Sequence, residues 1–294
     1  MDLSEHRNLV TTEWLARNLD SPDLRIIEAT SLLPNYFEDD ADQGLTKASG
    51  SKEWQASHIP GCAFADILGE LSDQGNERRM YAMPDANQFA DVMSRLGVGD
   101  NNAVVIYDRQ FNMWASRLWW MLRSFGFNNA AVLDGGWPKW VEEDRPVSNQ
   151  LPGYPPATFT ARPQPALIAE KDEVREAIGQ GSTCLINALD PDEFAGRPPH
   201  RYARSGRIPS SVNVPFVVTV DPESQQFVDD DELTKIFDSV GALDKDQVIC
   251  YCGGGIAACN TALALNRLGV DKVSVYDGSM TEWAGDPSLP LETD

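Results

Sequence analysis

The stretch VICYCGGGIAACNTALALNRLG, near the C-terminal end, places Cys252 between an apolar run and three glycines. A cysteine reacts as its thiolate. Gly253, Gly254 and Gly255 lack a Cβ, so the backbone can fold tightly and turn successive N–H groups inward to bind an anion. A helix expected over residues 256–268 directs its positive end at the same point. Cys252 is therefore a candidate nucleophile, and the loop suits both a thiolate and an anionic sulfur bonded to it.

Other interpretations of this loop stand beside that one. It is also compatible with a tight turn around an inert, buried cysteine. A phosphatase loop needs an arginine six positions after the cysteine to clamp phosphate, and Ala258 stands there. Cys250, Cys252 and Cys259 lack the Cys-x2-Cys spacing of a structural zinc site, so no metal is expected. The triplet is not a Gly-x-Gly-x-x-Gly motif, so no nucleotide or flavin cofactor is expected.

The elements around Cys252 occur twice in the chain. Residues 101–140 and 245–283 each contain an apolar run, a loop, a helical segment closed by a glycine, a second apolar run, and an Asp-Gly pair followed by a tryptophan. Aligning the two stretches puts Asp108 in the place of Cys252. Asp134 and Asp277 open the two Asp-Gly pairs and are predicted to be turn residues.

The repeats predict two domains of one α/β fold. Short apolar runs alternate with helical segments in each copy, which indicates a parallel sheet flanked by helices on both sides. A proline-rich stretch without helical periodicity separates the copies and predicts an extended linker. The predicted boundaries are 1–145, 146–165 for the linker, and 166–294. Ligands of such sheets gather at the carboxyl ends of the strands, where Cys252 follows the run QVICY.

Composition excludes several classes of partner. The chain has 24 Lys and Arg against 45 Asp and Glu, a formal net charge of −21. This charge disfavours nucleic acid and anionic membranes as partners. The sequence contains no run of 18 apolar residues, so no membrane span is expected. Its start lacks the basic and apolar pattern of a secretory signal, so none is expected. Five cysteines in a chain of this length fit a reducing compartment, so a cytoplasmic location is expected.

These motifs resemble the two-domain sulfurtransferases, the family of rhodanese and 3-mercaptopyruvate sulfurtransferase. The resemblance covers nearly the whole chain and is carried by HIPGCAFADI, RLWWMLRSFGF, VLDGGWPKW, GRIPSSVNVPF, YCGGGIAAC and VSVYDGS. It implies tandem rhodanese-like domains, each a parallel sheet flanked by helices. It also implies that the N-terminal domain is catalytically silent, because a carboxylate at Asp108 cannot accept a sulfane sulfur.

The resemblance implies a covalent mechanism without a cofactor. Cys252 would take sulfur from a small anionic donor, 3-mercaptopyruvate or thiosulfate, and pass it from a persulfide to a thiol or cyanide. The uncharged loop favours 3-mercaptopyruvate. The backbone amides that would hold the persulfide are those of Gly253, Gly254, Gly255, Ile256 and Ala257.

Several residues depart from the family's pattern. Gly254 and Ala257 replace hydroxyl residues, and Leu189 stands where an arginine usually clamps the donor's carboxylate. Arg197 and Arg201 are candidate substitutes for that arginine, but they are equally interpreted as exposed partners of surface acids.

His58 is a candidate for the interdomain cleft, although a structural histidine is the simpler interpretation. The departures leave a second functional hypothesis open, a non-catalytic persulfide carrier or sulfur-relay module that receives sulfur from a partner protein.

Overall fold

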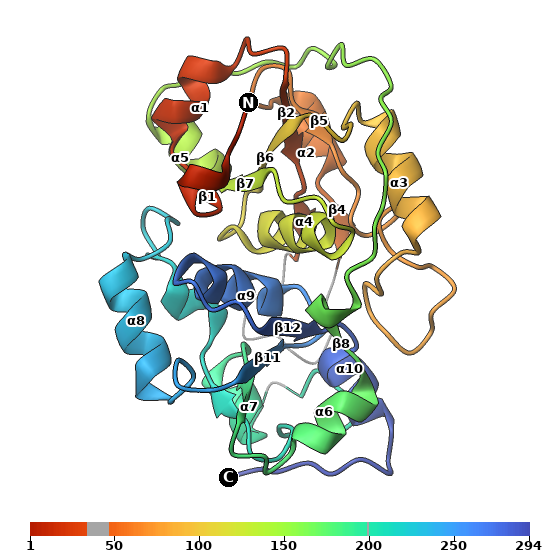
Figure 1. Ribbon diagram of the computed structural model, residues 1–294, viewed down its shortest axis with the longest axis vertical. Coiled ribbons are helices and arrows are strands. Elements are labelled where there is room, and N and C mark those ends of the chain that lie inside the picture. Colours follow the sequence, from red (N-terminus) through yellow and green to blue (C-terminus); the bar gives the residue numbers. More distant parts are fainter. Residues whose placement is uncertain (34–46, 199) are drawn as a thin grey trace.

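The computed structural model describes residues 1–33, 47–198 and 200–294, and it contains two similar halves that follow one another in the chain. Figure 1 shows the N-terminal half above the C-terminal half, with helices α4 and α9 facing each other between the two sheets. In the described ranges, no helix is both long and apolar enough to cross a bilayer.

Each half is built on a five-stranded sheet in which every described pairing is parallel. The order of the first sheet is β1-β7-β6-β2-β5, with strands β1 (Leu9–Val10), β2 (Leu24–Glu28), β5 (Ala63–Phe64), β6 (Ala103–Tyr107) and β7 (Ala130–Leu133). The order of the second is β10-β9-β11-β12-β8, with strands β8 (Ile168–Ala169), β9 (Thr183–Asn187), β10 (Val212–Asn213), β11 (Gln247–Tyr251) and β12 (Val273–Tyr276). The two orders are the same when corresponding strands are matched, so the sequence repeat is a structural repeat. A short antiparallel pair, β3 (Ser31–Leu32) and β4 (Ala48–Ser49), is added in the first half.

The helices follow the same repeat. The N-terminal half contains η1 (Ser4–His6), α1 (Thr12–Asn18), α2 (Ser51–Ala56), α3 (Ala86–Arg95), α4 (Met113–Ser124) and α5 (Gly136–Glu142). The C-terminal half contains η3 (Pro165–Leu167), α6 (Lys171–Ala177), α7 (Pro191–Ala195), η4 (Phe216–Thr219), α8 (Asp230–Ser239), α9 (Ala257–Arg267) and α10 (Ser279–Gly285).

Local sequence explains these elements. All five residues of β6 are buried, as expected for a strand covered on both faces. Asp85 and Asp229 cap the matching helices α3 and α8 by accepting hydrogen bonds from backbone N–H groups of the first turn. Gly126 and Gly269 follow α4 and α9 with φ of 82° each, a left-handed conformation that glycine adopts at little cost.

The stretch between the halves lies along the N-terminal half. Residues 151–164 contain no helix or strand. Their amides nevertheless pair with the N-terminal half: Ala157 donates to Ser94 O at 2.9 Å and Arg162 to Phe125 O at 2.8 Å. Phe159 is 5% exposed. This stretch is therefore extended, and it packs against the first half.

Two matching aspartates, one in each half, accept hydrogen bonds from the backbone of the other half. Asp134, which follows β7, accepts the backbone N–H of Phe227 at 2.8 Å. Asp277, which follows β12, accepts the backbone N–H of Met83 at 3.0 Å. Each aspartate therefore binds backbone of the other half. Asp134 lies in a turn and Asp277 in a bend, as predicted. Their contacts with the other half were not predicted, because local sequence does not show which distant segment packs against a turn.

Candidate functional site

Cys252 lies at the carboxyl end of β11, between this strand and the start of α9. Its thiol is free, and the residue is 2% exposed. Neighbouring segments therefore cover Cys252 almost completely.

A hydroxyl group at the base of the loop fixes its path. The Ser279 Oγ accepts the N–H groups of Cys252 and Gly255, both at 3.1 Å, and donates to Tyr276 O at 2.7 Å. Ser279 has a φ of 47°, which is unusual for a residue with a side chain. The hydroxyl thus ties both ends of the loop to the segment after β12.

The remaining amides of the loop have no such acceptor. Within the described residues, the N–H groups of Gly253, Gly254, Ile256 and Ala257 donate to no protein atom. They follow Cys252 in the chain up to the positive end of α9, where backbone N–H groups can bind an anionic sulfur. Gly255 differs from the expectation for residues 253–257, because its amide is already donated to Ser279.

The N-terminal half shows how the same kind of loop binds an anion. Asp108 occupies the matching position, and its Oδ1 accepts the N–H groups of Gln110 at 2.8 Å and Asn112 at 3.1 Å. Its Oδ2 accepts those of Trp114 at 2.7 Å and Ala115 at 2.8 Å. Burial raises the pKa of Asp108 to about 7, while the four amide donors act in the opposite direction. The Asp108 carboxyl group therefore occupies the backbone donors of this loop.

The loop glycines also make room for two aromatic neighbours. A Cβ on Gly254 would lie 3.1 Å from Met80 O and 3.2 Å from Tyr81 Cδ2, both in the N-terminal half. A Cβ on Gly253 would overlap the hydroxyl of Tyr202. Tyr81 and Tyr202 were missed in the sequence. The available signal was the pair of adjacent glycines itself, since such pairs often mark a close approach of another segment.

A buried ion pair lies beneath the loop. The Arg117 Nη2 from α4 is 2.7 Å from the Asp277 Oδ1, and both side chains are 1% exposed. Arg117 also donates to Tyr81 O at 2.7 Å and to Gly255 O at 3.3 Å. One guanidinium therefore connects the N-terminal half with the glycine loop.

The candidate anion-binding arginines are paired with carboxylates. Arg197 Nε lies 2.8 Å from Asp192 in an exposed pair. Arg201 Nε lies 3.6 Å from Glu193, and both side chains are nearly buried. Burial raises the pKa of Glu193 to about 7, and the charge of Arg201 opposes this shift. The structure does not bring either arginine into a described contact with Cys252.

The next two arginines of this segment hold the C-terminal end of the chain. Arg204 donates to four backbone carbonyls between Trp283 and Leu289. Arg207 pairs with Glu292 and Asp294.

His58 lies away from the glycine loop. It is fully buried and stacks on Trp54, with ring centroids 4.9 Å apart. Its Nδ1 is 2.7 Å from Trp54 O and its Nε2 is 2.9 Å from Gln150 O. These contacts join α2 to the stretch between the halves. They leave neither ring nitrogen directed at an interdomain ligand.

The other cysteines near the loop belong to the packing. Cys250 is fully buried on β11, and burial raises its pKa well above the ordinary value. Cys259 lies on α9 with its Sγ 3.0 Å from Gly255 O, and burial raises its pKa to about 12. Among the described residues, no group of His, Cys, Asp and Glu is arranged to hold a metal ion.

Comparison with known proteins identifies the family. The model of the rhodanese-like domain matches residues 11–143 and again residues 170–286. The chain belongs to the rhodanese family. It is 33% identical to thiosulfate/3-mercaptopyruvate sulfurtransferase 2 of Arabidopsis thaliana, over 98% of this chain and 87% of the relative. It is 31% identical to the human 3-mercaptopyruvate sulfurtransferase, over 94% of this chain and 92% of the relative.

A solved structure agrees with this rhodanese assignment. The 3-mercaptopyruvate sulfotransferase SseA from Escherichia coli superimposes with a TM-score of 0.80 at 30% identity, covering 92% of this chain and 98% of that one. The tandem rhodanese fold and the enzyme class expected from the sequence, a sulfurtransferase, are confirmed.

Proposed function

We propose that this rhodanese-family enzyme transfers sulfur from 3-mercaptopyruvate to a thiol or cyanide through a persulfide on Cys252. The observation that carries the proposal is the group of loop amides around Cys252 that have no acceptor in the described part of the chain. The matching loop, which binds the Asp108 carboxylate with four amides, supports the same use of backbone donors. We further propose that residues 1–145 form a silent domain, joined by residues 146–165 to a catalytic domain of residues 166–294.

The reaction follows from the loop's donors. The Cys252 thiolate attacks the donor's sulfur, a sulfur–sulfur bond forms, and the sulfur–carbon bond breaks. The electron pair of that bond leaves on the enolate of pyruvate, which takes up the proton that the donor's thiol loses. The persulfide anion is stabilised by the amides of Gly253, Gly254, Ile256 and Ala257, because charge-assisted hydrogen bonds are the stronger ones. An acceptor thiol or cyanide then attacks the outer sulfur and restores the thiolate, which predicts ping-pong kinetics.

The choice of donor rests on charge. Gly253 and Gly254 carry no positive charge, and the chain has a formal net charge of −21. Repulsion by this charge is stronger for a dianion such as thiosulfate than for a monoanionic 2-oxo acid.

The five cysteines are free thiols, which supports a reducing compartment such as the cytoplasm.

The test is to incubate the reduced protein with each donor and to measure the mass of the Cys252 peptide and the steady-state rates. We expect a gain of one sulfur atom, and faster pyruvate release than sulfite release. Cys252→Ser should lose both. Cys259→Ser, which changes a neighbouring buried thiol, should retain both. Sulfur transfer retained by Cys252→Ser would overturn the proposal. Sulfur accepted only from a protein donor would instead identify a persulfide carrier.

A further inference from the structure

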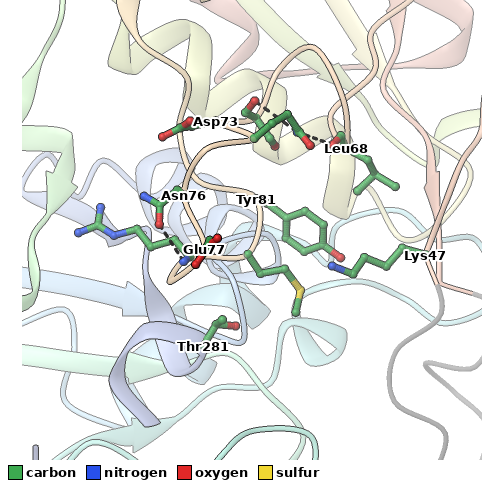
Figure 2. A pocket seen from close by; sticks show the side chains of 11 residues that line it. Lys47, Leu68, Asp73, Asn76, Glu77, Tyr81 and Thr281 are labelled. Atoms are coloured by element: carbon green, nitrogen blue, oxygen red, sulfur yellow. Dashed lines mark hydrogen bonds between the residues drawn. The ribbon is translucent and has the colours of Figure 1, made fainter. Parts of the chain in front are cut away.

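A cavity of about 350 Å³ opens between the halves beside the glycine loop. Its lining comes from the N-terminal half except for Thr281 of α10, and Figure 2 shows Lys47, Asp73, Glu77 and Tyr81 among the lining side chains. This volume is in the range of small-molecule sites.

The cavity ends against the glycine loop. Thr281 donates to Gly253 O twice, from its Oγ1 at 2.7 Å and from its backbone N–H at 2.9 Å. Met80 and Tyr81 close on Gly254 so tightly that a Cβ there would lie 3.1–3.2 Å from their atoms. Met80, Tyr81 and Thr281 therefore belong both to the lining of the cavity and to the surroundings of the glycine loop.

Two hydrogen-bond donors of this cavity, the Lys47 amine and the Tyr81 hydroxyl, lie close together and have no acceptor among the described residues. The Lys47 Nζ lies 4.8 Å from the centroid of the Tyr81 ring, and Figure 2 shows the Tyr81 hydroxyl pointing toward the Lys47 amine. The hydroxyl is shielded from solvent and, within the part of the chain described, has no hydrogen-bond partner. Lys47 forms no ion pair with any described residue. An unpaired buried hydroxyl is costly, and an anion would satisfy both donors.

Charge is unevenly distributed in the cavity. Asp73 and Glu77 lie across it from Lys47 (Figure 2). The charge of Arg79 is balanced by Glu170 and Glu282 of the C-terminal half. The positive end of the cavity is therefore at Lys47 and Tyr81, which is also the end that contacts Gly254.

Tyr81 keeps its proton at neutral pH. Burial and the nearby charge of Cys252 both raise the pKa of its hydroxyl. The phenol is thus a donor, like the lysine amine.

We propose that Lys47 and Tyr81 bind the carboxylate of the sulfur donor, a small 2-oxo acid carrying a thiol, and so replace the arginine absent at Leu189. This proposal rests on the proposed function and names its substrate subsite. Arg197 and Arg201 pair with Asp192 and Glu193, and neither of them lines this cavity.

The test compares Lys47→Ala and Tyr81→Phe with the matched control Lys52→Ala, a lysine on α2 that does not line the cavity. Loss of one charge-assisted hydrogen bond should raise the KM for 3-mercaptopyruvate about tenfold in Lys47→Ala. kcat and the KM for cyanide should stay within about twofold, because neither cyanide nor the sulfur transfer uses the amine. Lys47→Arg should have a KM for 3-mercaptopyruvate close to that of the wild type, and Lys52→Ala should match the wild type.

A probe without a thiol separates binding from chemistry. Pyruvate carries the same carboxylate, so its inhibition constant against the donor should rise with the KM in Lys47→Ala. An unchanged KM and inhibition constant, in a protein that still forms the Cys252 persulfide, would overturn this subsite alone. Absence of the persulfide in the wild type would overturn the proposed function itself.

Discussion

Arg117 and Asp277 form an ion pair of 2.7 Å between α4 of one half and the turn after β12 of the other, with 1% of each side chain exposed. Two charges at such depth are compensated only by each other and by further hydrogen bonds. Arg117 supplies these bonds to Tyr81 O and Gly255 O. The pair therefore couples the packing of the two halves to the position of the glycine loop.

Replacing one member of this pair should lower the free energy of unfolding more than replacing both members with apolar residues. We expect Asp277→Asn to lower the free energy of unfolding by about 3–5 kcal/mol, because it leaves the Arg117 charge buried without a counter-ion. Arg117→Met with Asp277→Leu should cost clearly less than the sum of the single changes. Urea unfolding of the wild type, Arg117→Met, Asp277→Leu and the double variant measures the coupling. Glu13→Gln, which breaks the exposed pair with Arg17, is the control and should stay within about 0.5 kcal/mol. Strictly additive effects would contradict the coupling.

Ser279 should affect turnover through the loop it positions. Ser279→Ala leaves the buried amides of Cys252 and Gly255 without an acceptor, at about 1–3 kcal/mol. We expect kcat to fall about tenfold or more, with a smaller change in the KM for the donor, because the amides are displaced where negative charge develops.

Two variants separate this effect from stability. Ser279→Gly relieves the backbone strain at φ of 47° and should lose as much turnover as Ser279→Ala. Thr281→Val removes a hydroxyl from Gly253 O but keeps the backbone N–H bonded to it, so it should lose less. Turnover that follows stability across the three variants would show that Ser279 acts only on the fold.

Much of the site could be predicted because it is encoded locally. Three neighbouring segments of the sequence form the site: the apolar run before Cys252, the three glycines after it and the helix that follows. The continuous apolar run and the helical periodicity are easily distinguished in the sequence. The repeat also identified Asp108 as the match of Cys252. Its four amide contacts show that the matching loop binds an anion.

The parts that were missed come from distant segments. Arg117 lies on a helix whose residues are nearly all buried, and RLWWML gives only the signal of packing. A charged residue in a helix that is apolar all round does require a buried partner, but only the fold shows that the partner is Asp277. Tyr81 likewise reaches the loop from the other half, so no local pattern predicts it.

Glu193 should make stability depend on pH. Its pKa is raised by burial from 4.5 to about 7, so between these values the folded state holds a proton that the unfolded chain releases. The free energy of unfolding should therefore fall as pH rises through this window, by at most about 1.4 kcal/mol per pH unit. Glu193→Gln cannot ionise and should remove this contribution, so the variant should gain about 2 kcal/mol on the wild type between about pH 5 and pH 7. Urea unfolding across this range measures the difference, with Glu13→Gln as an exposed control. Parallel curves for the wild type and Glu193→Gln would mean that Arg201 holds the carboxylate ionised throughout.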